Sequence, residues 1–292
     1  MEYGLGKNAQ ILYFSGTGGT RRVAEDLRGQ LKAQGLETEI SQIREPYPRV
    51  NPHASVLFLL FPVYEFNAPF PVIDWLRTVP NGIAIPTVVL SVSGGGDVFP
   101  NKGCRHDAIT ILERKGYKIA YEDMFVLPPN VFVALPPGVS SALLSLIPAK
   151  NKRILESLRN GEVRRTKTTP IDRLISRKGL KSAMRYASLF RKSLTVTREC
   201  VRCGRCVAEC PVNNLKIDGD AVQVMDHCAF CLNCVYTCPK RAMVTKKYSF
   251  ILLKDGYSLK AYEKALPDYE SIPKGVFMSG IRKYIRELRQ NR

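Results

Sequence analysis

The run CVRCGRCVAECP, residues 200–211, returns as CAFCLNCVYTCP at residues 228–239. Both copies follow the spacing C-x2-C-x2-C-x3-C-P, and each cysteine of the first copy has a counterpart 28 residues further along. Eight of the nine cysteines in the chain therefore fall in one ligand-like repeat. A chain of this size with no export signal is expected to keep its thiols reduced, so the repeat predicts metal binding rather than disulfides.

The spacing indicates which metal group is held. Three cysteines separated by two residues let one loop wrap three corners of a four-iron cubane, and in two-cluster proteins the fourth cysteine ligates the other cluster. We therefore predict two 4Fe-4S clusters. The ligands of one are Cys200, Cys203, Cys206 and Cys238, and those of the other are Cys228, Cys231, Cys234 and Cys210. The alternative is a pair of four-cysteine zinc sites, although zinc sites usually pair two short cysteine units across a longer gap.

The repeat resembles the bacterial ferredoxins that carry two 4Fe-4S clusters, and the resemblance covers roughly residues 195–247. The stretch PVNNLKI, residues 211–217, matches the segment that leads into a small strand in that family, and KRAM, residues 240–243, fills the second copy. The resemblance implies a small α+β domain that transfers electrons one at a time.

Strand-like and helix-like runs alternate through the N-terminal half. The apolar or alternating runs predict strands at residues 9–15, 37–43, 55–63, 85–93 and 117–127. The intervening helical runs make these βαβ units, which predicts an α/β fold with a doubly wound five-stranded parallel sheet. Because ligands of such sheets bind beyond the carboxyl ends of the strands, the loops there should converge on one site. These loops are residues 15–20, 62–70 and 91–103.

The first loop is rich in glycine and hydroxyl groups and consists of Ser15, Gly16, Thr17, Gly18, Gly19 and Thr20. It opens a predicted helix, whose first N–H groups are free to bind phosphate. It is not a dinucleotide fingerprint, because Arg21 stands where the last glycine belongs, and it lacks the Gly-Lys-Ser/Thr of a P-loop. Hydroxyls and backbone amides suit a terminal phosphate monoester. A purely structural turn, or a loop for another phosphate, is the alternative.

Over residues 8 to about 160 the chain looks like the flavodoxins, which bind FMN. The resemblance implies that the first loop holds the FMN phosphate. It also implies that Pro62, Val63 and Tyr64 present an aromatic ring to the isoalloxazine, with a rim aromatic and no cofactor as the alternative for Tyr64. A third set approaches the ring edge, helped by glycines without a Cβ: Ser93, Gly94, Gly95, Gly96 and Asp97. The chain departs from flavodoxins in Arg21 and Arg22 and in lacking their acidic surface.

The predicted organisation has four parts. Residues 1–162 form the flavodoxin-like FMN-binding domain, residues 163–194 a basic helical connector, and residues 195–250 the ferredoxin domain. Residues 251–292 form an extension with a short amphipathic helix at 274–290. This order resembles the flavodoxin–ferredoxin fusion proteins of anaerobic bacteria and archaea.

The formal net charge of +18 is concentrated in one segment, since residues 150–198 hold 15 Lys and Arg against 3 Asp and Glu. The connector helix is predicted to carry its cations on one arc. The other arc holds Ile171, Ile175, Tyr186, Leu189 and Phe190. The pattern predicts redox partner proteins with acidic surfaces or peripheral contact with an anionic membrane, and no specific nucleic-acid binding. A merely solvated face is the alternative.

The chain start lacks an export signal, and the longest apolar run, residues 54–63, is too short to span a bilayer. We therefore expect a cytoplasmic protein. We predict that it transfers electrons between the clusters and FMN and links one-electron with two-electron partners. The alternatives are a flavin-dependent oxidoreductase that reduces a quinone, a nitro compound or dioxygen, and an interaction module that the clusters only stabilise. No catalytic side chain is assigned. Cys104 is expected to be an ordinary thiol near the start of a helix, and His53, His106 and His227 lack a carboxylate or cysteine partner at catalytic spacing.

Overall fold

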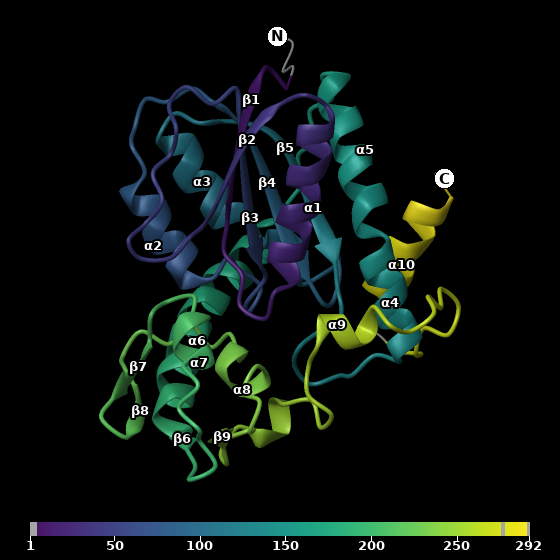
Figure 1. Ribbon diagram of the computed structural model, residues 1–292. Helices are drawn as coiled ribbons and strands as arrows, with labels where there is room; N and C mark the ends of the chain where they lie inside the picture. Colours follow the sequence, from purple (N-terminus) through teal and green to yellow (C-terminus); the bar gives the residue numbers. More distant parts are fainter. Residues whose placement is uncertain (1–4, 276–277, 291–292) are drawn as a thin grey trace.

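A five-stranded parallel sheet organises the N-terminal half of the protein (Figure 1). The computed structural model describes residues 5–275 and 278–290. Its sheet strands are β1 (Asn8–Tyr13), β2 (Glu37–Gln42), β3 (Val56–Pro62), β4 (Pro86–Ser93) and β5 (Lys118–Val126). They are arranged in the order β2-β1-β3-β4-β5, which is the order of flavodoxin-like doubly wound sheets. The predicted α/β fold class is confirmed.

Helices cover both faces of this sheet (Figure 1). One face packs against α1 (Gly19–Ala33) and α5 (Ile147–Arg159), and the other packs against α2 (Phe70–Thr78) and α3 (His106–Arg114). The central strand β3 is apolar throughout because both of its faces are covered, and its residues from Val56 to Phe61 are buried. The sheet therefore holds its carboxyl-end loops on a rigid base.

Beyond the edge strand β5, two further helices form a separate apolar layer. They are α4 (Pro137–Ser145) and α10 (Ser279–Arg289), and Val126 packs with Val139 and Ile281 between them. The predicted amphipathic helix at 274–290 is present as α10, while Phe277 of that prediction lies outside the described residues. The C-terminal extension thus returns to the N-terminal domain.

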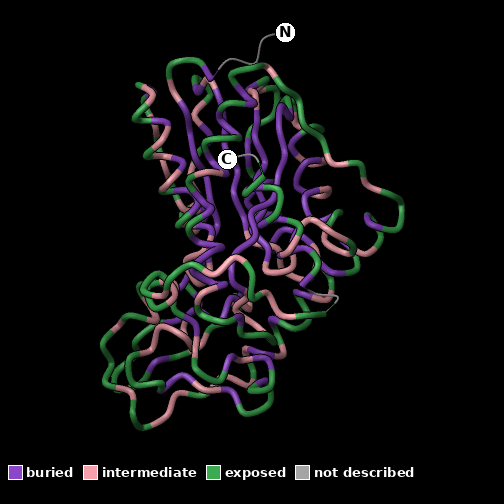
Figure 2. Tube along the Cα trace, turned by 90° about the vertical axis from the view of Figure 1, so that its right-hand side faces the viewer, coloured by how far each residue is buried: buried purple, intermediate pink, exposed green. Residues whose placement is uncertain are grey.

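The cysteine repeat forms a small α+β unit, as predicted. Its elements are β6 (Leu194–Val196), α7 (Arg205–Ala208), β7 (Leu215–Asp218), β8 (Ala221–Val224), α8 (Asn233–Tyr236) and β9 (Met243–Thr245). β6 pairs with β9 and β7 pairs with β8, both antiparallel. Buried residues gather in the large sheet and are sparser here (Figure 2). A unit with so small a core commonly depends on metal groups for its stability.

Short elements complete the fold: η1 (Asn101–Gly103), η2 (Ser249–Ile251) and α9 (Leu259–Tyr262). In the part of the chain that the structure describes, no helix has the length and apolar character needed to cross a membrane.

The predicted connector is a single long helix, α6 (Pro170–Ser193), that packs firmly on the N-terminal domain. A capping box between Thr169 and Asp172 starts it. Most of its buried face is built from small residues, and Phe190 is the one member of the predicted apolar arc that is fully buried. The buried positions are Asp172, Ser176, Gly179, Ala183, Ala187 and Phe190. A Cβ at Gly179 would lie 1.6 Å from the carbonyl oxygen of Glu65, so only glycine permits this approach.

Two residues of the predicted apolar arc, Ile171 and Tyr186, are exposed. For these two residues the prediction was wrong, because the helix approaches the domain closely at Gly179, where its backbone lies against Glu65. Phe190 of the same arc is buried, and Ile175 and Leu189 are half-buried.

The cysteine-bearing unit is also bonded directly to the sheet domain. Arg44 donates to the carbonyl oxygen of Ala208 at 3.1 Å and to Oδ1 of Asn213 at 2.7 Å. Asn213 donates in turn to the carbonyl oxygen of Glu45 at 2.9 Å. Ala229, between two cysteines of the second copy, is buried in the core on the α2–α3 side of the sheet. The two parts are therefore held in one orientation.

Candidate cofactor sites

The loop between β1 and α1 places the first backbone amides of α1 at the carboxyl edge of the sheet. Gly18 takes a left-handed conformation, with φ 94°, at the N-cap of α1 and offers no side-chain cap. The first N–H groups of a helix have no intrahelical acceptor, and that of Arg21 is bonded to Oγ of Ser15 at 3.2 Å. The loop thus has the geometry of an anion site, as the sequence predicts.

A cavity opens above this loop at the carboxyl edge of the sheet. We call it the flavin cavity, after the group that the sequence predicts for it. Ten of the fourteen predicted flavin-binding residues line it: Ser15, Gly16, Thr17, Gly19, Thr20, Pro62, Val63, Tyr64, Ser93 and Gly94. Three loops far apart in sequence are thus brought together by the sheet topology. Their hydroxyls, amides and aromatic ring fit a flavin with a terminal phosphate.

The other four predicted residues, Gly18, Gly95, Gly96 and Asp97, do not line the flavin cavity. Gly96 and Gly95 pack against Gly280 of α10. Asp97 forms an ion pair with Arg105, at 3.2 Å between Oδ2 and Nη2. The end of this loop therefore turns away from the cavity toward the β5 side of the sheet.

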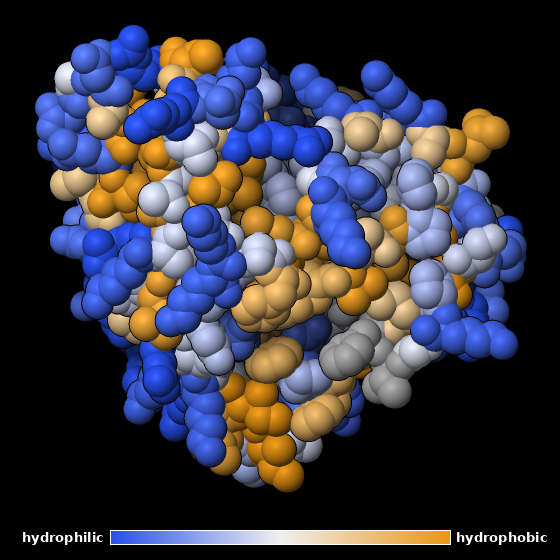
Figure 3. Space-filling view, turned by 90° about the horizontal axis from the view of Figure 1, so that it is seen from below, coloured by the Kyte–Doolittle hydropathy of each residue, from blue (hydrophilic) through white to orange (hydrophobic). Residues whose placement is uncertain are grey.

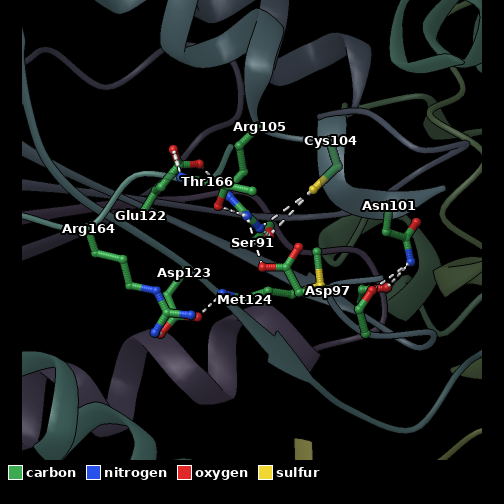
Figure 4. Close-up of polar contacts among 12 residues, drawn as sticks. Ser91, Asp97, Asn101, Cys104, Arg105, Glu122, Asp123, Met124, Arg164 and Thr166 are labelled. Carbon is green, nitrogen blue, oxygen red and sulfur yellow. Dashed lines mark hydrogen bonds and ion pairs between the residues drawn. The ribbon is translucent and has the colours of Figure 1, made fainter. Parts of the chain in front are cut away.

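Asp97 joins a buried polar network that ties several segments together (Figure 4). The Arg105 guanidinium, 1% exposed, also bonds Oε2 of Glu122 at 2.9 Å and Oγ1 of Thr166 at 2.8 Å. Cys104 lies beside it, fully buried, and burial raises the pKa of its thiol despite the neighbouring guanidinium. The ninth cysteine therefore lies in the interior of the sheet domain, apart from the cysteine repeat.

Two segments that the sequence did not predict complete the flavin cavity. One follows β5 and includes Pro128 and Asn130, and the other brings Tyr257 from the C-terminal extension. Tyr257 donates its hydroxyl to the carbonyl oxygen of Pro128 at 3.1 Å, and Asn130 donates to Oγ1 of Thr17 at 3.1 Å. The first segment could have been found, because β5 ends at the same edge as β1, β3 and β4. Tyr257 carries no local pattern that would place it here.

The cysteines line two further cavities, each with four thiols. The inner cavity contains Cys210, Cys228, Cys231 and Cys234. The outer cavity contains Cys200, Cys203, Cys206 and Cys238. These are the two groups of four that the sequence predicts as ligand sets. The fourth cysteine of each run reaches the cavity of the other copy because the chain turns away at the following proline.

The inner cavity is apolar, with no charged residue in its lining. Burial raises the pKa of the Cys228 thiol to about 11, and that of Cys231 is raised further. Such thiols ionise readily only beside a positive charge such as iron. Backbone N–H groups already point at the sulfurs, with Asn214 donating to Sγ of Cys210 at 3.2 Å and Phe230 donating to Sγ of Cys228 at 3.4 Å. This donor set fits an iron–sulfur cluster.

Zinc would require four thiolates within bonding distance of one ion. Among residues 5–275 and 278–290, no three His, Cys, Asp or Glu side chains converge in a way that could hold a single metal ion. The thiols of each set instead surround a cavity.

The inner cavity and the flavin cavity meet at Gly16. A Cβ on this residue would lie 2.5 Å from the Tyr64 hydroxyl and 2.6 Å from Cβ of Cys231. Burial, followed by the thiols of Cys231 and Cys228, raises the pKa of Tyr64 well above its ordinary value, so its hydroxyl stays protonated. Gly16 and Tyr64 line the flavin cavity and Cys231 lines the inner cavity. One thin layer of protein thus separates the two.

Comparison with known proteins agrees with the cysteine pattern. Residues 193–239 match the model of the 4Fe-4S dicluster domain. A ferredoxin of Methanothermococcus thermolithotrophicus is 43% identical over 47 residues, which cover 15% of this chain and 78% of that protein.

Among solved structures, the N-terminal half is similar to a flavodoxin from the domain Archaea, with 10% identity and a TM-score of 0.35 over 52% of this chain and 99% of that one. It is also similar to rubredoxin:oxygen oxidoreductase from Desulfovibrio gigas, with 12% identity and a TM-score of 0.37 over 55% of this chain and 38% of that one. The fold of this half rests on its own strand order rather than on these scores.

Proposed function

We propose that this chain, which belongs to the ferredoxin family, transfers electrons between two 4Fe-4S clusters and one FMN within a single polypeptide. The observation that carries the proposal is the contact at Gly16, where the flavin cavity adjoins the inner cysteine cavity. A cofactor in each cavity would have its neighbour close by, and the protein contributes mainly this positioning.

The proposed cluster ligands are the four thiols of the inner cavity and the four thiols of the outer cavity. The proposed phosphate site is the loop of residues 15–20, with Tyr64 and Tyr257 as aromatic walls. FMN supplies the ability to exchange one or two electrons, whereas each cluster exchanges one. The protein would therefore join one-electron and two-electron partners.

We further propose that exposed cations of α6 attract acidic redox proteins or an anionic membrane surface. Much of the charge counted in residues 150–198 is neutralised internally: Lys150 and Arg164 pair with Asp123, and Arg165 pairs with Glu122. The α6 cations Arg173, Arg177, Lys178 and Lys181 remain exposed. A cytoplasmic location stays a prediction.

The composition of the anaerobically purified protein tests the proposal. We expect about eight iron, eight sulfide and one FMN per chain. Zinc in place of iron, or FAD in place of FMN, would contradict it.

A turnover assay then separates a carrier from an oxidoreductase. The carrier should show no saturable reduction of a quinone, a nitro compound or dioxygen beyond that of free FMN.

A further inference from the structure

The two cysteine cavities differ in their access to the outside. In the inner cavity Cys210 and Cys231 are buried, and the lining includes the buried aromatic ring of Phe190. In the outer cavity Cys203 is exposed and the neighbouring Val201 is 57% exposed. The thiols of the outer cavity are therefore the more accessible of the two sets to another protein.

The cavities also differ in charge. Three cations line the outer cavity, Arg202, Arg205 and Lys240, and no acidic residue lines it. Arg202 pairs with Asp220, whereas Arg205 and Lys240 have no acidic partner among the residues that the structure describes. The surface around the exposed thiol is therefore positive.

The cysteine-bearing end of the molecule is seen directly in Figure 3, where hydrophilic side chains stand around apolar surface. This combination of a small apolar contact and a charged rim is typical of transient protein interfaces.

We propose that the outer cavity is the port through which this protein exchanges electrons with an acidic redox protein. The inference rests on the proposed function and adds the place of contact and the charge of the partner. In each encounter one electron passes between the partner and the group held by the outer cysteines. The donor loses this electron and is oxidised, the acceptor gains it and is reduced, and no bond is made or broken. Arg205 and Lys240 attract the partner, and the exposure of Cys203 lets the partner approach the group that this thiol would hold.

The test reduces the oxidised holoprotein with two one-electron donors of opposite charge, the radical cation of methyl viologen and the anionic radical of its sulfonatopropyl analogue. Stopped-flow loss of cluster absorbance gives the rate constants. In the double variant Arg205→Glu/Lys240→Glu the rate with the anionic donor should fall on the order of 10-fold at low ionic strength. The rate with the cationic donor should rise, and both differences should vanish at high salt.

The control variant Lys32→Glu/Lys118→Glu makes the same charge change at exposed positions outside the cysteine-bearing unit. It should leave both rates nearly unchanged. Equal effects of the two variants, or no effect of the first, would overturn the proposal. If charge reversal prevents cluster assembly, Arg205→Gln/Lys240→Gln should give the same trend at smaller size. An acidic ferredoxin used as electron donor should reduce the double variant more slowly than the wild type, as the anionic viologen does. Faster reduction of the double variant by this ferredoxin would also overturn the proposal.

Iron, sulfide and FMN contents of the wild-type holoprotein distinguish this proposal from the proposed function. Missing cofactors would contradict the proposed function. A complete protein whose rates ignore Arg205 and Lys240 contradicts only the port.

Discussion

Replacing Gly16 with alanine should separate the flavin cavity from the inner cysteine cavity. The backbone at Gly16 does not lie in the left-handed region, so alanine is permitted there and the change acts through contact alone. The new Cβ would lie 2.5 Å from Oη of Tyr64, 2.6 Å from Cβ of Cys231 and 3.3 Å from the carbonyl oxygen of Cys231. Two of these neighbours belong to the segment that carries a proposed cluster ligand.

The size of the effect follows from these distances. Ordinary contact between carbon atoms requires about 3.5–4.0 Å, so the two segments must move apart by about 1 Å. Tyr64 can turn aside at its flexible end, but Cβ and the carbonyl of Cys231 are fixed to the backbone. Overpacking of this kind costs about 1–3 kcal/mol. The melting temperature of the holoprotein should therefore fall by several degrees.

The decisive measurement is the rate of electron exchange between cluster and flavin after rapid partial reduction of the anaerobic holoprotein. In Gly16→Ala this rate should fall, because transfer between redox groups weakens steeply as their separation grows. Iron, sulfide and FMN contents should be retained. Gly29→Ala is a matched control, since a Cβ at Gly29 meets nothing within 4 Å.

An unchanged exchange rate in Gly16→Ala, together with the expected loss of thermal stability, would refute the route through this contact. Loss of FMN instead of rate would show that the substitution acts on the phosphate loop.

Three further substitutions test the cysteine grouping, the flavin cavity and a buried ion pair. Cys210→Ala should damage the cluster nucleated by Cys231 rather than the cluster of its own run, and electron paramagnetic resonance that shows the reverse loss would contradict the crossed arrangement. Tyr64→Ala should weaken FMN binding by about 1 kcal/mol, or roughly five-fold in Kd, through lost ring contact, and an unchanged affinity would place the flavin ring elsewhere. Asp123→Asn should destabilise the fold by about 3–5 kcal/mol because it leaves Lys150 buried without its carboxylate, which urea unfolding would measure. Although burial alone would raise it, Lys150 and Arg164 hold the pKa of Asp123 below its ordinary value, so the stabilising contribution should be complete above the ordinary carboxyl range and disappear as the pH falls through the lowered value. Wild type and Asp123→Asn should therefore converge in acid, and a constant difference between them would contradict this reasoning.

The features that could be predicted from the sequence are those with a local physical cause. The apolar runs of β3 and β4 follow from burial on both faces, and they reveal the parallel sheet. The cysteine spacing reflects the shape of a cluster, which is why the two ligand sets could be grouped without any structure. The convergence of the loops that begin at Ser15, Pro62 and Ser93 follows from sheet topology alone.

The features that were missed depend on contacts between segments distant in sequence. Tyr257 reaches the flavin cavity because its hydroxyl bonds the carbonyl of Pro128, a pairing of residues 129 positions apart. Asp97 leaves the cavity because Arg105, buried behind it, also needs Glu122 and Thr166. No periodicity or motif in the sequence predicts either of these two placements.

Helix α6 also makes contacts between segments distant in sequence, and these contacts involve both proposed cofactor regions. At Gly179 its backbone lies against Glu65, in the loop that carries Tyr64. Further along, Phe190 lines the inner cavity and packs against Phe230 in a tilted arrangement, with ring centroids 4.8 Å apart. Helix α6 contacts the loop of Tyr64 at one point and the loop of Phe230 at another, and it therefore helps to fix the distance between these two loops. The separation that would govern the proposed electron transfer therefore depends on a glycine in a basic helix as well as on the cysteines and the proposed phosphate loop.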